Sequence, residues 1–298
     1  MARIVLKIDV DTLRGTREGV PNLARMLDRA RAQATFLFSL GPDHTGWALR
    51  RVFKPGFLKK VSRTSVVEHY GLKTLMYGTL LPGPDIGRRA AAEMRAIRDA
   101  GFETGIHTWD HVYWQDNVRQ RPRDWTEQQM QRSYARFDEI FGAAPVTHGA
   151  AGWQMNDFAF EQIDAWNMAY ASDGRGHGPY RPVLNGRALN HIQLPTTLPT
   201  LDEVLGTNGI DTSNIAAYLL KKTANESADQ VFTLHAELEG QRLAPVFAAL
   251  LAGWQAQGHT LVTMGDYYAS LDLDSLPSHS VSWGEILGRS GDLIIQPQ

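Results

Sequence analysis

The chain has 298 residues, of which 43% are hydrophobic and 21% charged, and it contains no cysteine. This length and composition support a full hydrophobic core, which excludes intrinsic disorder and a small disulfide scaffold. The absence of cysteine excludes disulfides, thiolate nucleophiles and cysteine-bound zinc, and the formal charge of -2 gives no global attraction for nucleic acid.

The N-terminal part of the sequence predicts a strand–helix–strand unit. Residues 3–10 predict a buried strand, apolar residues at helical spacing over 20–30 predict an amphipathic helix, and 34–40 predict a second strand. The alternation then continues, with strands predicted at 102–107, 145–148, 168–172, 230–235 and 260–263, and helices at 86–100, 130–141, 157–165, 213–223 and 243–257. Six or seven such repeats favour a barrel-like α/β fold.

Two segments interrupt this pattern. Residues 41–85 form a connection far longer than the usual loop between a strand and a helix, so we expect a functional insertion. Residues 271–298 form an irregular extension that we expect to pack around the barrel exterior. Without a linker between these parts, we expect one catalytic domain over 1–298.

The sequence also bears on the compartment. It has no apolar stretch long enough to span a membrane, and Lys7 and Asp9 interrupt the apolar stretch near its N-terminus. We therefore expect no signal peptide, a cytoplasmic location and, at most, peripheral contact with a membrane.

Carboxylates and imidazoles follow several of the predicted strands. Active sites of α/β barrels form at the carboxyl ends of the strands, so these side chains predict one shared metal-assisted hydrolytic site. They are Asp9, Asp11, His107, His111, His148, Asp173 and His235.

The most informative pair is His107 and His111. Four residues apart on a helical turn, both imidazoles would project from one face and could bind one ion, although two unrelated polar histidines would also fit. Asp9 and Asp11 follow the first strand, so one could bind the metal while the other acts as a base. Asp11 would also suit a turn cap.

Two further residues allow more than one interpretation. His235 ends a strand, where it would suit a general acid or a satisfied core histidine. Asp173 could orient a histidine, bind substrate or start a turn in the glycine-rich segment that follows it.

Together, these motifs resemble the polysaccharide deacetylase superfamily (carbohydrate esterase family 4) over about residues 3–270. The resemblance rests on Asp-Val-Asp at 9–11, His-Thr-Trp-Asp-His at 107–111, Ala-Gly-Trp at 151–153 and Leu-His-Ala at 234–236. It implies a distorted (β/α)7 TIM-like barrel with Asp9 as base, His235 as acid, and a metal on Asp11, His107 and His111. Substrate or oxyanion contacts are expected from Gly149, Ala150, Ala151, Gly152, Trp153 and Asp173.

The sequence departs from the general family pattern in two places. Val10 separates the usual adjacent aspartates, so the roles of Asp9 and Asp11 could be reversed. The arginine of the third motif is replaced by the region around His148, which leaves open the residue that orients the base. One divalent ion is expected. An aspartate and two histidines suit zinc, while cobalt, manganese and nickel could occupy the same site.

Within the family, the long insertion and the Lys-Ile-Asp-Val-Asp-Thr opening resemble the deformylase branch. This implies hydrolysis of the N-formyl group of undecaprenyl phosphate-linked 4-deoxy-4-formamido-L-arabinose, giving the 4-amino sugar lipid and formate. The context would be lipid A modification and polymyxin resistance, without a nucleotide cofactor. The alternative is an N-deacetylase acting on an acetamido sugar of a glycolipid or polysaccharide.

The insertion contains a basic, aromatic segment with no acidic residue. Such a composition favours contact with anionic headgroups and a lipid phosphate over a simple solvated face, here at the cytoplasmic side of the inner membrane. A later apolar run at 72–81 either extends this surface or packs on the barrel. The predicted contact residues are Trp47, Arg50, Arg51, Lys54, Lys59, Lys60 and Arg63.

Overall fold

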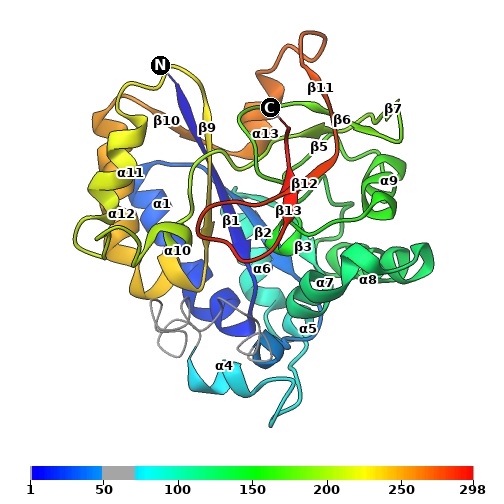
Figure 1. Cartoon of the computed structure of the whole chain (residues 1–298). Helices are drawn as coiled ribbons and strands as arrows, with labels where there is room; N and C mark the ends of the chain where they lie inside the picture. The colour runs from blue at the N-terminus through cyan, green and yellow to red at the C-terminus, as the bar shows by residue number, and fades with distance from the viewer. Residues whose placement is uncertain (1, 49–70, 298) are drawn as a thin grey trace.

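The computed structural model describes residues 2–48 and 71–297, and their centre is a curled parallel sheet (Figure 1). Seven strands follow one another in the order β10, β1, β2, β3, β4, β5 and β8, and β9 also pairs with β1. Every pairing within this sheet is parallel. The strands are β1 (Arg3–Val10), β2 (Thr35–Ser39), β3 (Glu103–Thr108), β4 (Thr147–His148), β5 (Tyr170–Ala171), β8 (Ile192–Gln193), β9 (Gln230–His235) and β10 (Thr260–Val262).

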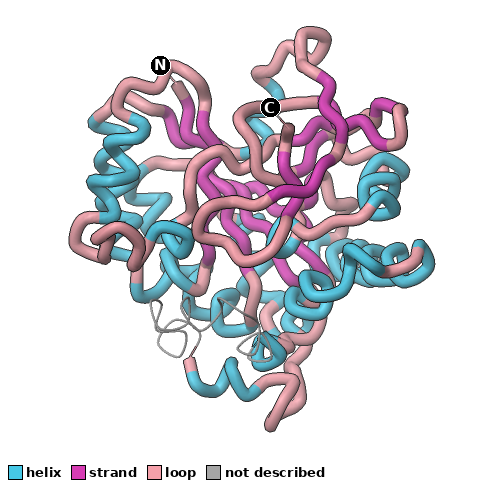
Figure 2. Tube along the Cα trace, viewed as in Figure 1, coloured by secondary structure: helices cyan, strands magenta, loops and turns pink. Residues whose placement is uncertain are grey.

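Helices pack around the outside of the sheet, as Figures 1 and 2 show. Their apolar faces and the outward side chains of the strands, such as Ile8, Phe36 and Ile106, form one buried core. The predicted parallel α/β barrel of the (β/α)7 type is confirmed, whereas the assignment of 1–298 to one domain stays a prediction. The larger helices are α1 (Val20–Ala30), α6 (Ala91–Asp99), α8 (Arg123–Phe141), α9 (Asp157–Ala165), α11 (Ile215–Thr223) and α12 (Ala244–Ala256).

Shorter elements connect this framework. The short helices are α4 (Leu72–Met76), α5 (Ile86–Arg89), α7 (His111–Asn117), α10 (Leu201–Val204) and α13 (Met264–Ala269). The remaining strands are β6 (Arg181–Leu184), β7 (Arg187–Ala188), β11 (Ser278–Ser280), β12 (Ser282–Gly284) and β13 (Leu293–Ile295). Short π-helical turns occur at η1 (Gly15–Gly19) and η5 (Leu238–Arg242), and 3₁₀-helical turns occur at η3 (Val118–Gln120) and η4 (Ala151–Trp153).

The predicted helix over 86–100 is interrupted in the structure. It is divided into α5 and α6 at Ala90, whose φ of −130° and ψ of 21° leave the helical region. The guanidinium of Arg17 donates a hydrogen bond to the carbonyl of Arg89 at the break, at 2.5 Å. The apolar spacing of the two pieces still matches one helix, so the sequence pattern alone does not reveal the break.

Two π-helical turns bring the ends of β1 and β9 close together. A Cβ atom on Gly19 would lie only 2.0 Å from the carbonyl oxygen of Ala236, and one on Gly240 would lie 2.7 Å from the Cα of Gly19. Only glycine allows backbones to approach this closely. The packing of η1 on η5 therefore fixes the segment after Asp11 against the segment after His235.

The C-terminal extension differs from the irregular exterior packing expected from the sequence. The backbone of Arg175 exchanges hydrogen bonds with Ile294 and Gln296, at 2.9 and 2.7 Å, so β13 runs beside the segment that follows β5. The side-chain amide of Gln154 donates to the carbonyl of Asp292 at 2.7 Å, next to η4. The extension therefore supports the loop that follows β4, and Figure 1 shows it crossing in front of the sheet.

None of the helices within 2–48 and 71–297 has the length and apolar character needed to cross a lipid bilayer.

Candidate active site

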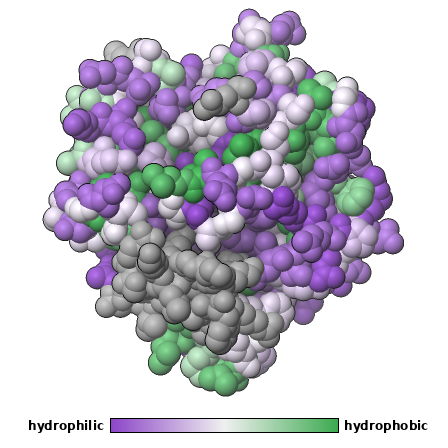
Figure 3. Space-filling view, in the orientation of Figure 1, coloured by the Kyte–Doolittle hydropathy of each residue, from purple (hydrophilic) through white to green (hydrophobic). Residues whose placement is uncertain are grey.

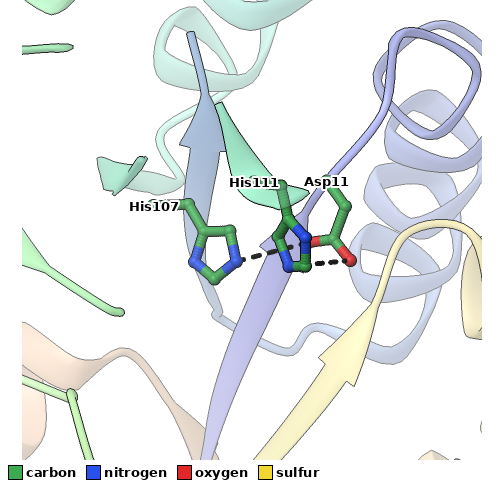
Figure 4. Close-up of side chains that lie close together, drawn as sticks. All are labelled: Asp11, His107 and His111. Atoms are coloured by element: carbon green, nitrogen blue, oxygen red, sulfur yellow. Dashed lines mark ion pairs between the residues drawn. The ribbon is translucent and has the colours of Figure 1, made fainter. Parts of the chain in front are cut away.

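Asp11, His107 and His111 come together where β1 and β3 end (Figure 4). Asp11 Oδ1 lies 3.3 Å from His107 Nε2, and Asp11 Oδ2 lies 3.5 Å from His111 Nε2. One ligand atom from each residue falls within 4.8 Å of the others, which is the spacing of a potential metal site. His107 belongs to β3 and His111 begins α7, so the turn between strand and helix brings the imidazoles together instead of the single helical turn predicted.

His107 is oriented so that it can bind a cation. Its Nδ1 lies 2.6 Å from the carbonyl oxygen of Gly149, which can only accept a hydrogen bond. In the neutral imidazole the proton therefore sits on Nδ1, and the lone pair of Nε2 faces Asp11. Neither Nε2 nor Asp11 Oδ1 has a hydrogen-bond partner among the described residues. Two buried acceptors facing each other at 3.3 Å fit a divalent ion between them.

Asp11 is held in place by Glu237, a residue that the sequence analysis did not identify. The backbone N–H groups of Asp11 and Thr12 and the hydroxyl of Thr12 all donate to Glu237 Oε1, at 3.1, 2.8 and 2.8 Å. Gly15 leaves room for this carboxyl group, because a Cβ there would lie 1.8 Å from the same oxygen. A carboxylate two residues after a strand-end histidine is the signal that could have indicated it.

The protonation preferences of this cluster follow from burial and from its charges. Burial alone would raise the pKa of Asp11, but the imidazoles of His111 and His107 outweigh it and lower that pKa. Burial likewise opposes the protonation of His107, while Asp9 and Asp11 raise its pKa. Burial and the nearby Asp11 raise the pKa of Glu237 well above its usual range. Asp11 therefore remains a carboxylate, the form that binds a metal.

Asp9 lies beside this cluster on the same strand face as Lys7. Asp9 Oδ2 lies 3.5 Å from the ammonium of Lys7 and Asp9 Oδ1 lies 3.8 Å from His107 Nδ1. Oδ1 is buried and has no hydrogen-bond partner among the described residues. Asp9 is thus outside the group of candidate ligands and has one carboxylate oxygen that can accept a proton.

His235 ends β9 directly beside Asp9, with which it pairs in register. The imidazole is half-buried, and its Nδ1 finds no hydrogen-bond partner in the described parts of the chain. Its backbone N–H donates to Glu239 Oε2 at 2.8 Å. Burial raises the pKa of Glu239 to about 7, although His235 opposes this rise. Glu239 is a neighbour of the site that no sequence motif indicated.

The loop after β4 contributes backbone groups to the site. The N–H of Gly149 already donates to the carbonyl of Ile106 at 2.9 Å, so Gly149 orients His107 and is not an oxyanion donor. The predicted oxyanion contacts are therefore reduced to Ala150, which precedes η4, and to Ala151 and Gly152 within it. This correction arises from the pairing of β3 with the segment after β4, which a sequence does not specify.

Trp153 ends the η4 turn and is 98% buried, so it offers a substrate little surface as a groove wall. Its φ of 54° is unusual for a bulky residue. Three cationic side chains surround its ring, with Arg289 from the C-terminal extension 4.5 Å from the ring centre, Arg175 at 5.0 Å and Lys7 at 5.7 Å.

Asp173 and His148 form a separate buried pair. Asp173 Oδ1 accepts from His148 Nδ1 at 2.6 Å, and Oδ2 accepts from the Gln193 amide at 2.8 Å. The histidine lowers the pKa of Asp173 although burial opposes this. Both carboxylate oxygens are engaged, so we leave Asp173 out of the proposed substrate contacts. It orients a histidine, which was one of the alternatives that the sequence allowed.

The predicted membrane residues are only partly within the described structure. Trp47 is half-buried, stacks on His44 with ring centres 4.0 Å apart and packs edge-on against Tyr113. Its indole N–H also donates to the carbonyl of Gly78. These contacts give Trp47 a packing role in the insertion. Outside the described residues lie Arg50, Arg51, Lys54, Lys59, Lys60 and Arg63.

Comparisons with known proteins show the family to which the chain belongs. A family model described as Polysaccharide deacetylase matches residues 3–170. A Shewanella sediminis (strain HAW-EB3) protein named "Probable 4-deoxy-4-formamido-L-arabinose-phosphoundecaprenol deformylase ArnD" is 36% identical over 291 residues, which cover 98% of this chain and 93% of that protein.

Solved structures show the same fold at low sequence identity. A Mycobacterium smegmatis protein assigned as a polysaccharide deacetylase superposes with a TM-score of 0.63 and 17% identity, over 96% of this chain and 95% of that one. A family 4 acetyl xylan esterase from Clostridium thermocellum, solved with a cobalt ion, gives a TM-score of 0.50 and 12% identity, over 89% and 90% of the two chains.

Proposed function

This chain belongs to the polysaccharide deacetylase family, and from that premise we propose that it is a metal-dependent deformylase of a lipid-linked formamido sugar. As a hydrolase of amide C–N bonds, it would release formate from undecaprenyl phosphate-linked 4-deoxy-4-formamido-L-arabinose and leave the 4-amino sugar lipid. The observation that carries the proposal is the Asp11–His107–His111 cluster, in a chain similar over nearly its full length to a protein named for this reaction.

A divalent ion held by Asp11, His107 and His111 would supply an acidified water and polarise the formyl oxygen. The donor set of one carboxylate and two imidazoles suits zinc, cobalt, manganese or nickel, and it leaves positions open for water and substrate. The cobalt ion in the acetyl xylan esterase supports this type of site.

Asp9 and His235 are the proposed base and acid. Asp9 accepts a proton from the attacking water at Oδ1, its oxygen without a partner among the described residues. As the C–N bond breaks, the protonated imidazole of His235 donates a proton to the sugar nitrogen, which would otherwise leave as a poor anionic leaving group. The products are formate and the free amine. A backbone N–H from Ala150, Ala151 or Gly152 is the proposed donor to the oxyanion.

A lipid carrier requires contact with the membrane surface, and the insertion is the proposed contact region. Within the apolar run 72–81, Leu75 packs inward, whereas Leu72 and Leu80 are 68% and 79% exposed. Figure 3 shows hydrophobic surface at this end of the molecule, where Figure 1 places α4. These residues and the six basic residues before them support peripheral binding at the cytoplasmic face of the inner membrane, in lipid A modification and polymyxin resistance.

The alternative is an N-deacetylase of the same family, because an acetamido sugar would need the same metal, base and acid. The similarity, over nearly the full length of both chains, to a protein named for the deformylase reaction favours the formyl substrate. The test is to incubate metal-loaded protein with the formamido and the acetamido forms of one polyprenyl phosphate sugar, and to assay formate and acetate. We expect formate in large excess. Predominant acetate release would replace the proposal with the alternative, and release of neither acid would refute both.

A further inference from the structure

Lys7 is one of the largest fully buried side chains in the described structure, and it points into the barrel beside Asp9. Residues two apart on a strand share a face, so Lys7 and Asp9 project together from β1. A buried lysine is rarely found without a partner for its charge. Lys7 meets the Asp9 carboxylate at 3.5 Å.

The ammonium of Lys7 is fixed by contacts from two sides. It donates a hydrogen bond to the carbonyl oxygen of Ser172, after β5, at 2.9 Å, so the side chain spans the interior from β1 to β5. Gly149 makes room for it, because a Cβ at that position would lie 3.2 Å from the ammonium nitrogen. The lysine therefore has a defined position from which it acts on Asp9.

The contact of Lys7 distinguishes the two oxygens of Asp9. Oδ2 is paired with the ammonium, whereas Oδ1 has no hydrogen-bond partner among the described residues. We propose that Lys7 is the positioning residue for Asp9, holding Oδ2 so that Oδ1 is presented as the proton acceptor. This inference rests on the proposed function, because it assigns Lys7 to the base of that reaction.

The test is a set of Lys7 variants in the metal-loaded, full-length protein. Lys7→Met removes the charge and the donor, whereas Lys7→Gln and Lys7→Arg keep a donor for Oδ2. For Lys7→Met we expect kcat to fall about 100-fold, the size of effect that a misplaced reacting group produces, with KM and bound metal nearly unchanged. Lys7→Gln and Lys7→Arg should retain more activity than Lys7→Met, and they provide the ranking if Lys7→Met does not fold.

Two controls separate positioning from a structural role. Thr233 is a buried polar neighbour of Lys7 on β9, and its hydroxyl is hydrogen-bonded to that of Thr196 at 2.6 Å. The control variant Thr233→Val should keep kcat within about threefold of the wild-type value. In an Asp9→Asn background, adding Lys7→Met should lower the residual kcat by less than about threefold, because Lys7 acts through Asp9.

The inference would be overturned if Lys7→Met kept a kcat near that of the wild type, or if Lys7→Gln and Lys7→Arg had a kcat no higher than that of Lys7→Met. It would also be overturned if the fold losses in kcat of the two single variants multiplied in the double variant of Lys7 and Asp9. Formate release by the wild-type protein is measured in the same assay. If the wild type releases no formate, the proposed function fails. If it does and the Lys7 variants match it, only the positioning role fails.

Discussion

Two clusters of aspartate and histidine lie at the carboxyl ends of this sheet, and they differ in how their atoms are paired. In the cluster of Asp11, His107 and His111, carboxylate oxygens and imidazole nitrogens approach to 3.3 and 3.5 Å. In the cluster of His148, Asp173 and Gln193, the Asp173 carboxylate accepts hydrogen bonds from His148 Nδ1 at 2.6 Å and from the Gln193 amide at 2.8 Å. In the first, Asp11 Oδ1 and His107 Nε2 face each other without a hydrogen-bond partner among the described residues, and in the second both carboxylate oxygens accept hydrogen bonds.

The difference shows how a binding site can be distinguished from a structural polar network with the same residue types. Facing acceptors in a buried place are unfavourable unless a cation lies between them. Paired donors and acceptors need no ligand and add to stability instead. To decide whether an aspartate or histidine at a strand end binds a ligand, the hydrogen-bond partner of each of its polar atoms is therefore more informative than its position.

The most severe test of this distinction is a matched pair of substitutions, Asp11→Asn and Asp173→Asn. Asp11→Asn removes a ligand, so we expect the bound metal to be lost and kcat/KM to fall at least about 1000-fold, or ~4 kcal/mol of transition-state stabilisation. Metal analysis and formate release are the measurements. Tight metal binding by purified Asp11→Asn would contradict the assignment of Asp11 as a ligand.

The acid and the base should affect turnover without affecting the metal. Asp9→Asn and His235→Ala should each lower kcat by about 10²- to 10⁴-fold, the usual contribution of a positioned proton donor or acceptor. Bound metal, measured by atomic absorption, should stay at one ion per chain. Near-full kcat in Asp9→Asn would show that another group accepts the proton.

Asp173→Asn should have the opposite profile to Asp11→Asn. It removes the charged partner of His148 and Gln193, so we expect the free energy of unfolding to fall by about 3–5 kcal/mol, as when the charged member of a buried, hydrogen-bonded network is removed. Denaturant unfolding measures this loss. The folded variant should keep kcat within about threefold and keep its metal. A variant that is stable but inactive would move Asp173 into the active site.

A smaller effect should appear in the pH dependence of stability. The pKa of Glu239 is about 7 in the folded chain against 4.5 for an ordinary glutamate, so its contribution to stability is complete below pH 4.5 and is lost as the pH rises through 7. Over that window the loss amounts to about 3 kcal/mol, from ~1.4 kcal/mol per unit of pKa difference.

Glu239→Gln should remove this loss, because a glutamine can still accept the hydrogen bond from the His235 backbone. Denaturant unfolding of the metal-free protein between pH 5 and 8 measures this loss of stability. Glu226→Gln, at an exposed glutamate, is the control. Parallel stability curves for the wild type and Glu239→Gln would show that Glu239 does not titrate in this range.

The sequence predicted the framework of the fold well, because its signals are periodic. Alternating apolar strands and amphipathic helices gave the order of the barrel elements, and Gly142 ends α8 in the left-handed conformation expected of a helix stop. The break at Ala90 escaped prediction, since both halves of that helix keep the same apolar face. The strands of the C-terminal extension are only three residues long, too short for a periodic signal.

For the site, the sequence identified the side chains that end strands but not those that act through tertiary contacts. Asp11, His107 and His111 were predicted as a set, and the structure brings them together. Glu237 escaped notice because it accepts from Asp11 and Thr12, which follow another strand. Lys7 escaped notice because the sequence shows neither its burial nor its contact with Ser172 after β5. Asp173 was predicted among the substrate contacts because the sequence does not show that His148 and Gln193 occupy both of its carboxylate oxygens.

The most direct test of the account is to locate the metal by anomalous scattering from crystals of protein loaded with one equivalent of zinc or cobalt. We expect a single strong peak within about 2.0–2.2 Å of ligand atoms from Asp11, His107 and His111. A peak at His148 and Asp173, or full formate release from protein with no ion at Asp11, would contradict it.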